Sequence, residues 1–463
     1  MKKFPSALRA WGEDVLLKRV VRNSSYLFGS NVIGAVLSIL TANLLGVESY
    51  GILGVVTTLV ANINRLFSFR MGEVVVKNMG EFLAKNERER AAAIVKAAGL
   101  AEGLTSIAAY LLLALCAPLA ARYIAKDLSA LPLFLIYGTT ILGNITTETA
   151  TGVLQVGNHY RSQAMINLAQ SVLVAVLIVF AAFSKAGLWE VTLIYMAGKM
   201  VLGLGPIVVA LYWLPRMLGR DWWRASFSLL PPRRQLFRFA ISTNFSGTIN
   251  VVARDSENLW ISYFFSPLEA GYFKVALALI NLIGMPITPF ISTTYPEITR
   301  TIVLKQWSHL RSLLSRVTAI AAGWTAAVAV GLVMLGKPIL FSNGSLFGHT
   351  FHIYKPEYLP AFPALLILLL GYGLANILFW NRTLLLALGQ ADYPLKIGFY
   401  TALVKVSLTV LLVPHFGYLM EAALLSLYLL ASVGLTARRG LRDVRRLERI
   451  SLESASPSVG SAV

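Results

Sequence analysis

Three charged residues stand inside an apolar run that is long enough to cross a lipid bilayer. The stretch NVVARDSENLWISYFF, residues 250–265, contains Arg254, Asp255 and Glu257. A charged side chain near the bilayer centre costs roughly 2.5–3.5 kcal/mol on insertion scales, so such residues pair with one another or line water. One interpretation is an internal salt bridge between Arg254 and Glu257. The other is a hydrated cleft that these side chains line.

Further charged residues fall within predicted membrane spans. Two of them lie near span ends, from which a long side chain reaches the interface, namely Lys274 and Arg382. Glu102 is interpreted as the partner of Lys199, with an ion-coupling role as the alternative. The sequence indicates no partner for Arg65, Glu148 and Lys405.

Helical spacing groups the charges with small and polar residues, because steps of three or four residues keep side chains on one helix face. In residues 237–263 this face holds Asn244, Gly247, Asn250, Arg254 and Glu257 or Asn258, and in residues 49–69 it holds Thr58, Asn62 and Arg65. In residues 269–295 it holds Lys274, Ala278, Asn281, Met285 and Thr288, and in residues 24–46 it holds Ser30, Gly34, Ser38 and Thr41. Four such faces suit the walls of a hydrated cleft.

The composition is that of a polytopic membrane protein. Hydrophobic residues make up 56% of the 463 residues and charged residues 14%, whereas soluble domains carry about 25% charge. The net charge is +19, but Lys and Arg fall mainly in short segments between apolar runs, which indicates membrane topology rather than nucleic-acid binding. The single cysteine, Cys116, lies in an apolar stretch, so neither a disulfide framework nor a thiolate metal site is predicted.

About twelve spans of roughly 20 apolar residues are predicted. They are residues 24–46, 49–69, 91–117, 130–155, 163–184, 188–213, 237–263, 269–295, 313–341, 360–386, 394–413 and 417–437. Lys and Arg number about thirty on one side of these spans. The other side has Arg122, Lys126, Lys185, Lys337 and Lys355. The positive-inside rule therefore places both termini in the cytoplasm.

The second half of the chain repeats the first. The stretches GSNVIGAVLSILTANLLGVESYGILGVV and STNFSGTINVVARDSENLWISYFFSPLEAGYFKVALAL both begin with a Ser/Asn motif and close a short turn with Glu and Gly. An even number of spans in each half makes the repeats parallel. We predict an all-α protein with a cytoplasmic amphipathic segment 1–22, a six-helix lobe 23–214, a linker 215–236, a six-helix lobe 237–437 and a basic tail 438–463.

The predicted span 269–295 contains Gly284, Pro286 and Pro289 close together. Proline removes a backbone hydrogen bond and kinks a helix. Such a kink serves either as a hinge between two conformations or as a static bend, and the sequence leaves both open.

The sequence lacks motifs for enzyme chemistry. A P-loop for ATP binding is absent. His349 and His352, in GHTFHIY, have no carboxylate pair nearby, so no metal site is predicted. A membrane glycosyltransferase or polymerase is expected to carry acidic motifs in large exposed loops, and the loops here are short. We therefore predict a protein that is not an enzyme and that needs no cofactor or metal.

Four segments carry a family likeness: LLGVESYGILGVV, SPLEAGYFKVALAL, TTYPEITR and LALGQADYPLKIGFYTALVKVSLTVLLVPHFGYLMEAAL. In order and spacing they resemble the polysaccharide-transporter branch of the multidrug/oligosaccharidyl-lipid/polysaccharide (MOP) superfamily, the Wzx-type flippases for lipid-linked sugars. Each motif is degenerate, but together they are distributed over most of the chain, from residue 44 to residue 424.

The resemblance implies two six-helix bundles in a V, with the first, second, seventh and eighth spans lining the cleft. It implies a cell-membrane protein that moves an undecaprenyl-diphosphate-linked oligosaccharide from the inner to the outer leaflet. The residues implied to hold the diphosphate and acidic sugars are Arg65, Arg254 and Lys274. Those implied to contact sugar hydroxyls are Asn62, Asn250 and Asn281. Those implied to carry a coupling ion are Asp255 and Glu257, with Glu102 as a further candidate.

The implied partners are the lipid-linked oligosaccharide, membrane lipid, and polysaccharide polymerase and chain-length proteins. Two other functions stay open. One is a proton- or sodium-coupled multidrug or cation antiporter of the same superfamily, and the other is a scaffold of a polysaccharide assembly complex that does not transport. The cationic helix faces favour an anionic substrate over a cationic one.

Overall fold

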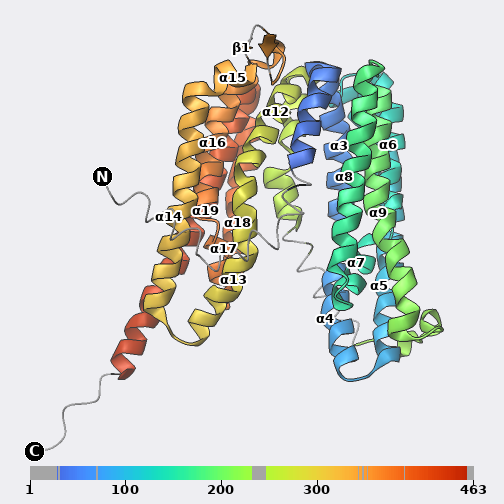
Figure 1. Ribbon diagram of the computed structural model, residues 1–463, viewed down its shortest axis with the longest axis vertical. Helices are drawn as coiled ribbons and strands as arrows, with labels where there is room; N and C mark the ends of the chain where they lie inside the picture. The colour runs from blue at the N-terminus through green and yellow to red at the C-terminus, as the bar shows by residue number, and fades with distance from the viewer. Residues whose placement is uncertain are drawn as a thin grey trace, which may run out of the picture.

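The computed structural model describes residues 32–68, 71–231, 247–341, 344–346, 349–351, 353–390 and 392–455, together with Gly29 and Asn244. The predicted N-terminal segment 1–22, Ser30, part of the linker 215–236 and the last residues of the tail lie outside these ranges. The parts that are described form two helical bundles, which lie together at one end of the molecule and diverge toward the other (Figure 1).

The first bundle comes from the first half of the chain. Its helices are Val32–Leu45, α3 (Val47–Phe67), α4 (Met71–Ala84), α5 (Arg88–Tyr123), α6 (Leu131–Gly143), α7 (Thr147–Val156), α8 (Tyr160–Phe183) and α9 (Leu188–Leu218). Short 3-10 turns are η1 (Leu128–Ala130), η2 (Trp222–Arg224) and η3 (Phe227–Leu229). The long helices are apolar over most of their length, as a bilayer requires.

The second bundle comes from the second half. Its elements are a helix over residues 247–254, α11 (Glu257–Phe264), α12 (Pro267–Gly284), η4 (Met285–Ile287), α13 (Thr288–Val303), α14 (Trp307–Gly331), the π-helical turn η5 (Leu332–Gly336), α15 (Lys337–Phe341), η6 (Pro356–Tyr358), α16 (Ala361–Ile377), α17 (Asn381–Ala387), α18 (Asp392–Phe416) and α19 (Tyr418–Ala455). Between α15 and η6 lies a small antiparallel hairpin of β1 (Gly344–Leu346) and β2 (His349–Phe351). The prediction of an all-α chain missed this hairpin, which caps one end of the molecule (Figure 1).

Within the described residues, ten helical segments are long and apolar enough to cross a membrane. This confirms a multi-pass membrane protein. The two remaining predicted spans, 24–46 and 237–263, each run into residues outside the described ranges. We call the end of the molecule with the β-hairpin the hairpin end. The opposite end carries the turns 85–87 and 304–306, beside which several arginines lie in the sequence, and we call it the basic end.

Four predicted spans are interrupted, although the sequence predicts each as continuous. The interruptions fall at residues 144–146, 255–256, 285–287 and 378–380. The third coincides with the predicted hinge: α12 ends at Gly284, and α13 begins at Thr288 with Pro289 in its first turn. Proline explains that break, because its ring removes a backbone donor. The first and last fall in the fourth predicted span of each half, as expected for parallel repeats.

The helix α19 extends well beyond the predicted end of its span at residue 437. It continues to Ala455 through the basic segment that the sequence assigns to a tail. The extension is amphipathic: Val444 is buried in an apolar cluster with residues of α13, α14 and α17. Arg311 of α14 also lies 2.8 Å from Glu448. Packing against the bundle therefore keeps this polar sequence helical outside the apolar region.

Two glycines allow the bundles to touch at the hairpin end. A Cβ atom on Gly51 of α3 would lie 1.8 Å from the carbonyl oxygen of Pro267, and one on Gly271 of α12 would lie 2.3 Å from that of Val47. Real side chains do not tolerate such distances, so only glycine permits this approach of α3 and α12. Asn43 adds a polar contact, because its Oδ1 accepts a hydrogen bond of 3.0 Å from the backbone N–H of Lys355.

We expect Gly271→Leu to separate the bundles at the hairpin end, because the added side chain overpacks the helix interface by about 1–3 kcal/mol. Cysteines placed at Asn43 and Lys355, with Cys116 replaced by serine, would report the separation by cross-linking. The cross-linking yield should fall by about fivefold to tenfold. Gly323→Leu is the matched control, because no neighbouring atom lies within 4 Å of a Cβ atom built on Gly323. An unchanged yield in Gly271→Leu would show that this contact does not hold the bundles together.

Candidate functional site

A cavity of about 470 Å³ lies between the two bundles and is lined by both. The first bundle contributes side chains of α3, α6 and α9, and the second contributes the interrupted seventh span, α12 and α16. The polar lining residues are Thr57, Thr58, Asn62, Asn64, Arg65, Tyr137, Thr140, Asn144, Lys199, Arg254, Asp255, Glu257, Asn258, Asn281 and Tyr372. We call this space the inter-bundle cavity.

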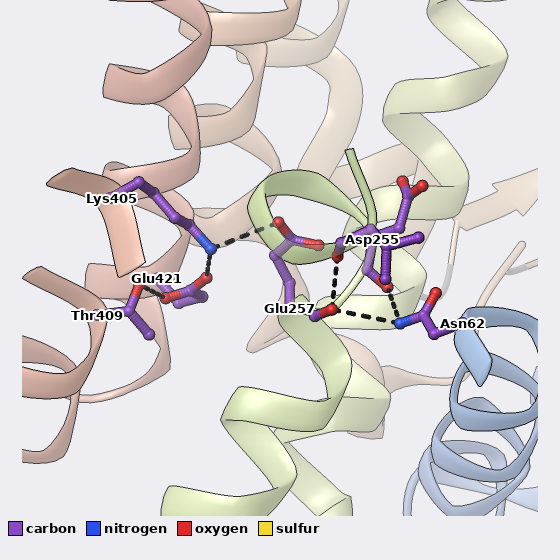
Figure 2. Close-up of polar contacts among 8 residues, drawn as sticks. Asn62, Asp255, Glu257, Lys405, Thr409 and Glu421 are labelled. Atoms are coloured by element: carbon purple, nitrogen blue, oxygen red, sulfur yellow. Dashed lines mark hydrogen bonds and ion pairs between the residues drawn. The ribbon is translucent and has the colours of Figure 1, made fainter. Parts of the chain in front are cut away.

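The break at residues 255–256 is held by side chains from the other bundle. Asn62 of α3 donates from Nδ2 to the carbonyl oxygen of Asp255 at 3.0 Å and to Oγ of Ser256 at 3.3 Å (Figure 2). Arg65, one helical turn away, lies with Nη1 2.5 Å from Oδ2 of Asp255. A broken helix leaves backbone groups without partners inside a membrane protein, and these contacts satisfy one of them. The polar face of α3 predicted from spacing therefore lies against the break.

Arg254 stands on the other side of the break and faces the cavity. Its guanidinium carbon lies 5.3 Å from the ring centroid of Tyr372, which is a cation–π contact. Among the described residues it makes no ion pair, so the salt bridge with Glu257 that the sequence allowed is not formed. The reason is the break itself, because α11 starts anew at Glu257 and no longer continues the helix face on which Arg254 lies.

Glu257 instead belongs to a cluster inside the second bundle, which we call the buried triad: Glu257 of α11, Lys405 of α18 and Glu421 of α19. Nζ of Lys405 lies 3.5 Å from Oε1 of Glu257 and forms a closer ion pair with Glu421. Thr409 donates to Glu421 at 2.9 Å. The side chains of the triad are at most 2% exposed, and Figure 2 shows Lys405 between the two carboxylates. Glu421 was not predicted as a partner of Lys405. The available signal was its position, because it is an acidic residue in the predicted span that follows the span of Lys405.

Glu102 has a different partner from the one predicted. Its carboxylate accepts hydrogen bonds from the backbone N–H groups of Glu148 at 2.8 Å and Thr149 at 2.9 Å. These N–H groups belong to the first turn of α7, where the helix dipole favours a negative charge. The prediction that Glu102 pairs with Lys199 is therefore wrong. The ion-coupling role of Glu102 stays a prediction.

Lys199 lines the inter-bundle cavity and makes no ion pair among the residues that the structure describes. Its side chain is exposed to the cavity rather than buried inside the first bundle. The sequence gave it the wrong neighbour. It joins Arg65 and Arg254 as the third cationic residue of the lining.

Lys274 lies outside both the inter-bundle cavity and the second cavity described below. Its Nζ sits 4.0 Å from the ring centroid of Tyr50 and donates to the Tyr50 carbonyl oxygen at 3.3 Å. Gly54 provides the space, because a Cβ atom there would lie 2.7 Å from the Lys274 side chain. The structure thus places Lys274 in the contact between α3 and α12 rather than on the predicted cleft wall.

A second cavity of about 720 Å³ lies mainly within the second bundle. The residues that it shares with the inter-bundle cavity are Arg254, Asn281 and Tyr372. The other polar residues of its lining are Glu73, Asn250, Asn376, Asn381, Arg382, Asp392, Tyr428, Ser432 and Thr436. Arg254 and Asn281 therefore stand where the two cavities adjoin, and four asparagines line the second cavity.

The comparison with known proteins rests on both sequence and fold. Residues 18–302 match the family model described as polysaccharide biosynthesis protein. The chain belongs to this family. The inner membrane protein YghQ of Escherichia coli K12 is 22% identical over 347 residues, which cover 72% of this chain and 94% of YghQ.

Several solved structures of transporters and of a flippase share the fold of this member of the polysaccharide biosynthesis protein family. An inward-facing multidrug resistance MATE family transporter matches with a TM-score of 0.72 at 13% identity, over 91% of this chain and 96% of the other. The lipid II flippase MurJ matches with a TM-score of 0.69 at 14% identity, over 93% and 90%. A MOP superfamily transporter from Pyrococcus furiosus matches with a TM-score of 0.63 at 13% identity, over 93% and 96%. The resemblance drawn from the sequence is confirmed for both family and fold.

Proposed function

We propose that this protein is a flippase that moves an undecaprenyl-diphosphate-linked oligosaccharide, the repeat unit of an O-antigen, capsule or exopolysaccharide, from the inner to the outer leaflet. The observation that carries the proposal is the charge of the inter-bundle cavity. Its lining has three cationic residues, Arg65, Lys199 and Arg254. Of its two carboxylates, Glu257 is bound to Lys405 in the buried triad, so the cavity has an excess of positive charge.

A diphosphate that enters this cavity leaves water and needs charged partners in return. Arginine offers a planar fork of donors to phosphate oxygens, and lysine adds a point charge. The sugars then contact Asn62 in the inter-bundle cavity, and Asn250 and Asn281 in the second cavity. The polyprenyl tail stays in the lipid between the bundles. The fold supports this reading, because the lipid II flippase MurJ shares it.

Transport proceeds by alternating access of two six-helix lobes, residues 23–214 and 237–437, within a topology of about twelve spans whose termini face the cytoplasm. The bundles touch at the hairpin end and diverge toward the basic end (Figure 1). With the basic end in the cytoplasm, this is the conformation that receives a substrate from inside. Gly284, Pro286 and Pro289, at the break between α12 and α13, are the hinge of the second lobe.

A proton bound at Glu257 drives the cycle, with Asp255 and Glu102 as further acidic candidates. The buried triad contains two carboxyl groups and one ammonium group, so full ionisation leaves a net negative charge inside the membrane. Such a charge is costly, and one bound proton removes it. Gain and loss of that proton change the charge beside the inter-bundle cavity, because Glu257 also lines it. Asp255, at the break before Glu257, connects this site to Arg65 and Asn62 of the first bundle. The chain itself acts without enzymatic chemistry.

The setting is the inner membrane, as for the relative YghQ of Escherichia coli K12. The partners are membrane lipid, and the polymerase and chain-length proteins that use the flipped oligosaccharide. The likeness to a multidrug MATE transporter favours one second candidate, a cation antiporter. The two candidates predict opposite charges for the substrate.

Proteoliposomes separate these functions. The purified full chain is reconstituted with a polyprenyl-diphosphate oligosaccharide in one leaflet, and a lectin reads the sugar that reaches the other leaflet. We expect movement well above that in protein-free liposomes, and no accumulation of a cationic dye. Transport of the dye without movement of the lipid would identify the antiporter. Inactivity toward both substrates would favour the scaffold and overturn the flippase.

A further inference from the structure

An ion pair joins the two bundles inside the inter-bundle cavity. Arg65 comes from α3 of the first bundle, and Asp255 comes from the break in the seventh span of the second, with 2.5 Å between Nη1 and Oδ2. The side chains are 58% and 33% exposed, so this pair stands in the cavity, unlike the buried triad. An exposed pair of this kind contributes little to stability and exchanges partners readily.

The carboxylate of Asp255 occupies the donors that an anionic ligand of Arg65 would use. The neighbouring cationic residues, Lys199 and Arg254, make no ion pairs within the described part of the chain. Of the three cationic residues of the cavity, Arg65 therefore has an anionic partner, whereas Lys199 and Arg254 have none among the described residues. Asp255 keeps its place without Arg65, because Asn62 binds its backbone carbonyl and not its carboxylate.

We propose that Asp255 is a competing anion built into the substrate site, which holds Arg65 in the empty protein, yields it to a diphosphate and reclaims it when the substrate leaves. This inference rests on the proposed function. A diphosphate carries more negative charge than one carboxylate, so it replaces Asp255 on Arg65 while also reaching Lys199 or Arg254. A site with three free cations would hold a diphosphate tightly and release it slowly. Asp255 therefore weakens binding and accelerates release.

Binding of farnesyl diphosphate, a short soluble analogue, to the purified full chain tests the competition. We expect Asp255→Asn to tighten binding by about tenfold, because a charge-assisted hydrogen bond to Arg65 no longer competes. Asp255→Glu keeps the charge and should bind nearly as the wild type does. Asp221→Asn is the matched control, since it removes the same charge from the exposed segment after α9.

A double-mutant cycle makes the test specific. With Arg65 replaced by methionine, Asp255→Asn should change the dissociation constant by less than about twofold. The reason is that Asp255 and the diphosphate then have no Arg65 guanidinium for which to compete. In the flipping assay, Asp255→Asn should lower both the apparent KM and the maximal rate, whereas loss of a purely structural contact would lower the rate alone.

Two outcomes would overturn the inference. If Asp255→Asn binds farnesyl diphosphate no more tightly than the wild type, Asp255 is a contact between the bundles and not a competitor. The proposed function would survive that result, provided that the wild type binds the analogue and flips the lipid. If the wild type neither binds the analogue nor flips the lipid, both proposals fail together.

Discussion

Replacing Arg254 with alanine will reduce flipping of a polyprenyl-diphosphate oligosaccharide by at least about 100-fold, the loss expected when two charge-assisted hydrogen bonds are removed. Arg254 faces the inter-bundle cavity, where it contacts the ring and the hydroxyl group of Tyr372 and forms no ion pair with a described carboxylate. Its remaining donors are thus available to a phosphate. Arg65, by contrast, forms an ion pair with Asp255. Flipping is measured in proteoliposomes by lectin access to the sugar.

Lysine at position 254 separates charge from geometry. Arg254→Lys keeps the positive charge but loses the planar pair of donors, so we expect an intermediate loss of about tenfold. Arg300→Ala is the matched control, because Arg300 is an exposed arginine in the last turn of α13 and lines neither cavity. Size-exclusion profiles and thermal melting establish that each variant is folded. Flipping by Arg254→Ala within twofold of the wild type would reduce Arg254 to a structural residue.

The polar face of α3 shows what the sequence can predict about this site. Thr58, Asn62 and Arg65 were grouped by helical spacing alone, and all three line the inter-bundle cavity. Spacing works here because α3 is continuous over Val47–Phe67, so residues three or four apart share a face. Hydropathy is similarly reliable for the ten spans found among the described residues, since the cost of exposing polar groups to lipid leaves few alternatives.

The same reasoning failed where a helix is broken. Arg254 and Glu257 were placed on one face, but the chain leaves the helix at residues 255–256 and restarts, so Glu257 meets Lys405 instead. No proline or glycine marks that break, and the contacts that hold it come from α3, which is distant in sequence. The predicted partner of Glu102 was wrong for a related reason. The break before α7 supplies backbone N–H groups that bind its carboxylate, and a pattern of side-chain charges does not reveal them.

Lys274 illustrates a limit set by packing between the bundles. Its spacing puts it on the same face as Asn281, which does line the cavity. Gly54 on α3, however, leaves room for the lysine stem, and Tyr50 supplies both a ring and a carbonyl oxygen. The location of such a space depends on which residues of two helices face each other. A single amino-acid sequence does not show which residues of the two helices face each other.

The buried triad leads to the second large effect, which concerns stability. We expect Lys405→Met to lower the free energy of unfolding by about 3–5 kcal/mol, because it leaves two buried carboxyl groups without their cation. Glu257→Gln should be tolerated, since Lys405 and Glu421 then form a neutral pair. Thermal unfolding of the detergent-solubilised protein, followed by size-exclusion chromatography, would rank the variants. Lys396→Met is the matched control on α18, because Lys396 is exposed.

Restoring neutrality distinguishes charge from shape as the cause. The triple variant Glu257→Gln, Lys405→Met, Glu421→Gln keeps nearly the same volume and removes every charge of the triad, so it should recover most of the lost stability. It should also flip at a rate that is independent of an imposed pH gradient, as should Glu257→Gln alone, because neither retains the carboxyl group of Glu257. If Lys405→Met unfolds at the same temperature as Lys396→Met, the ion pairs of the triad do not stabilise the protein. If Glu257→Gln still responds to the pH gradient, the coupling proton binds elsewhere, and Asp255 and Glu102 become the groups to replace next.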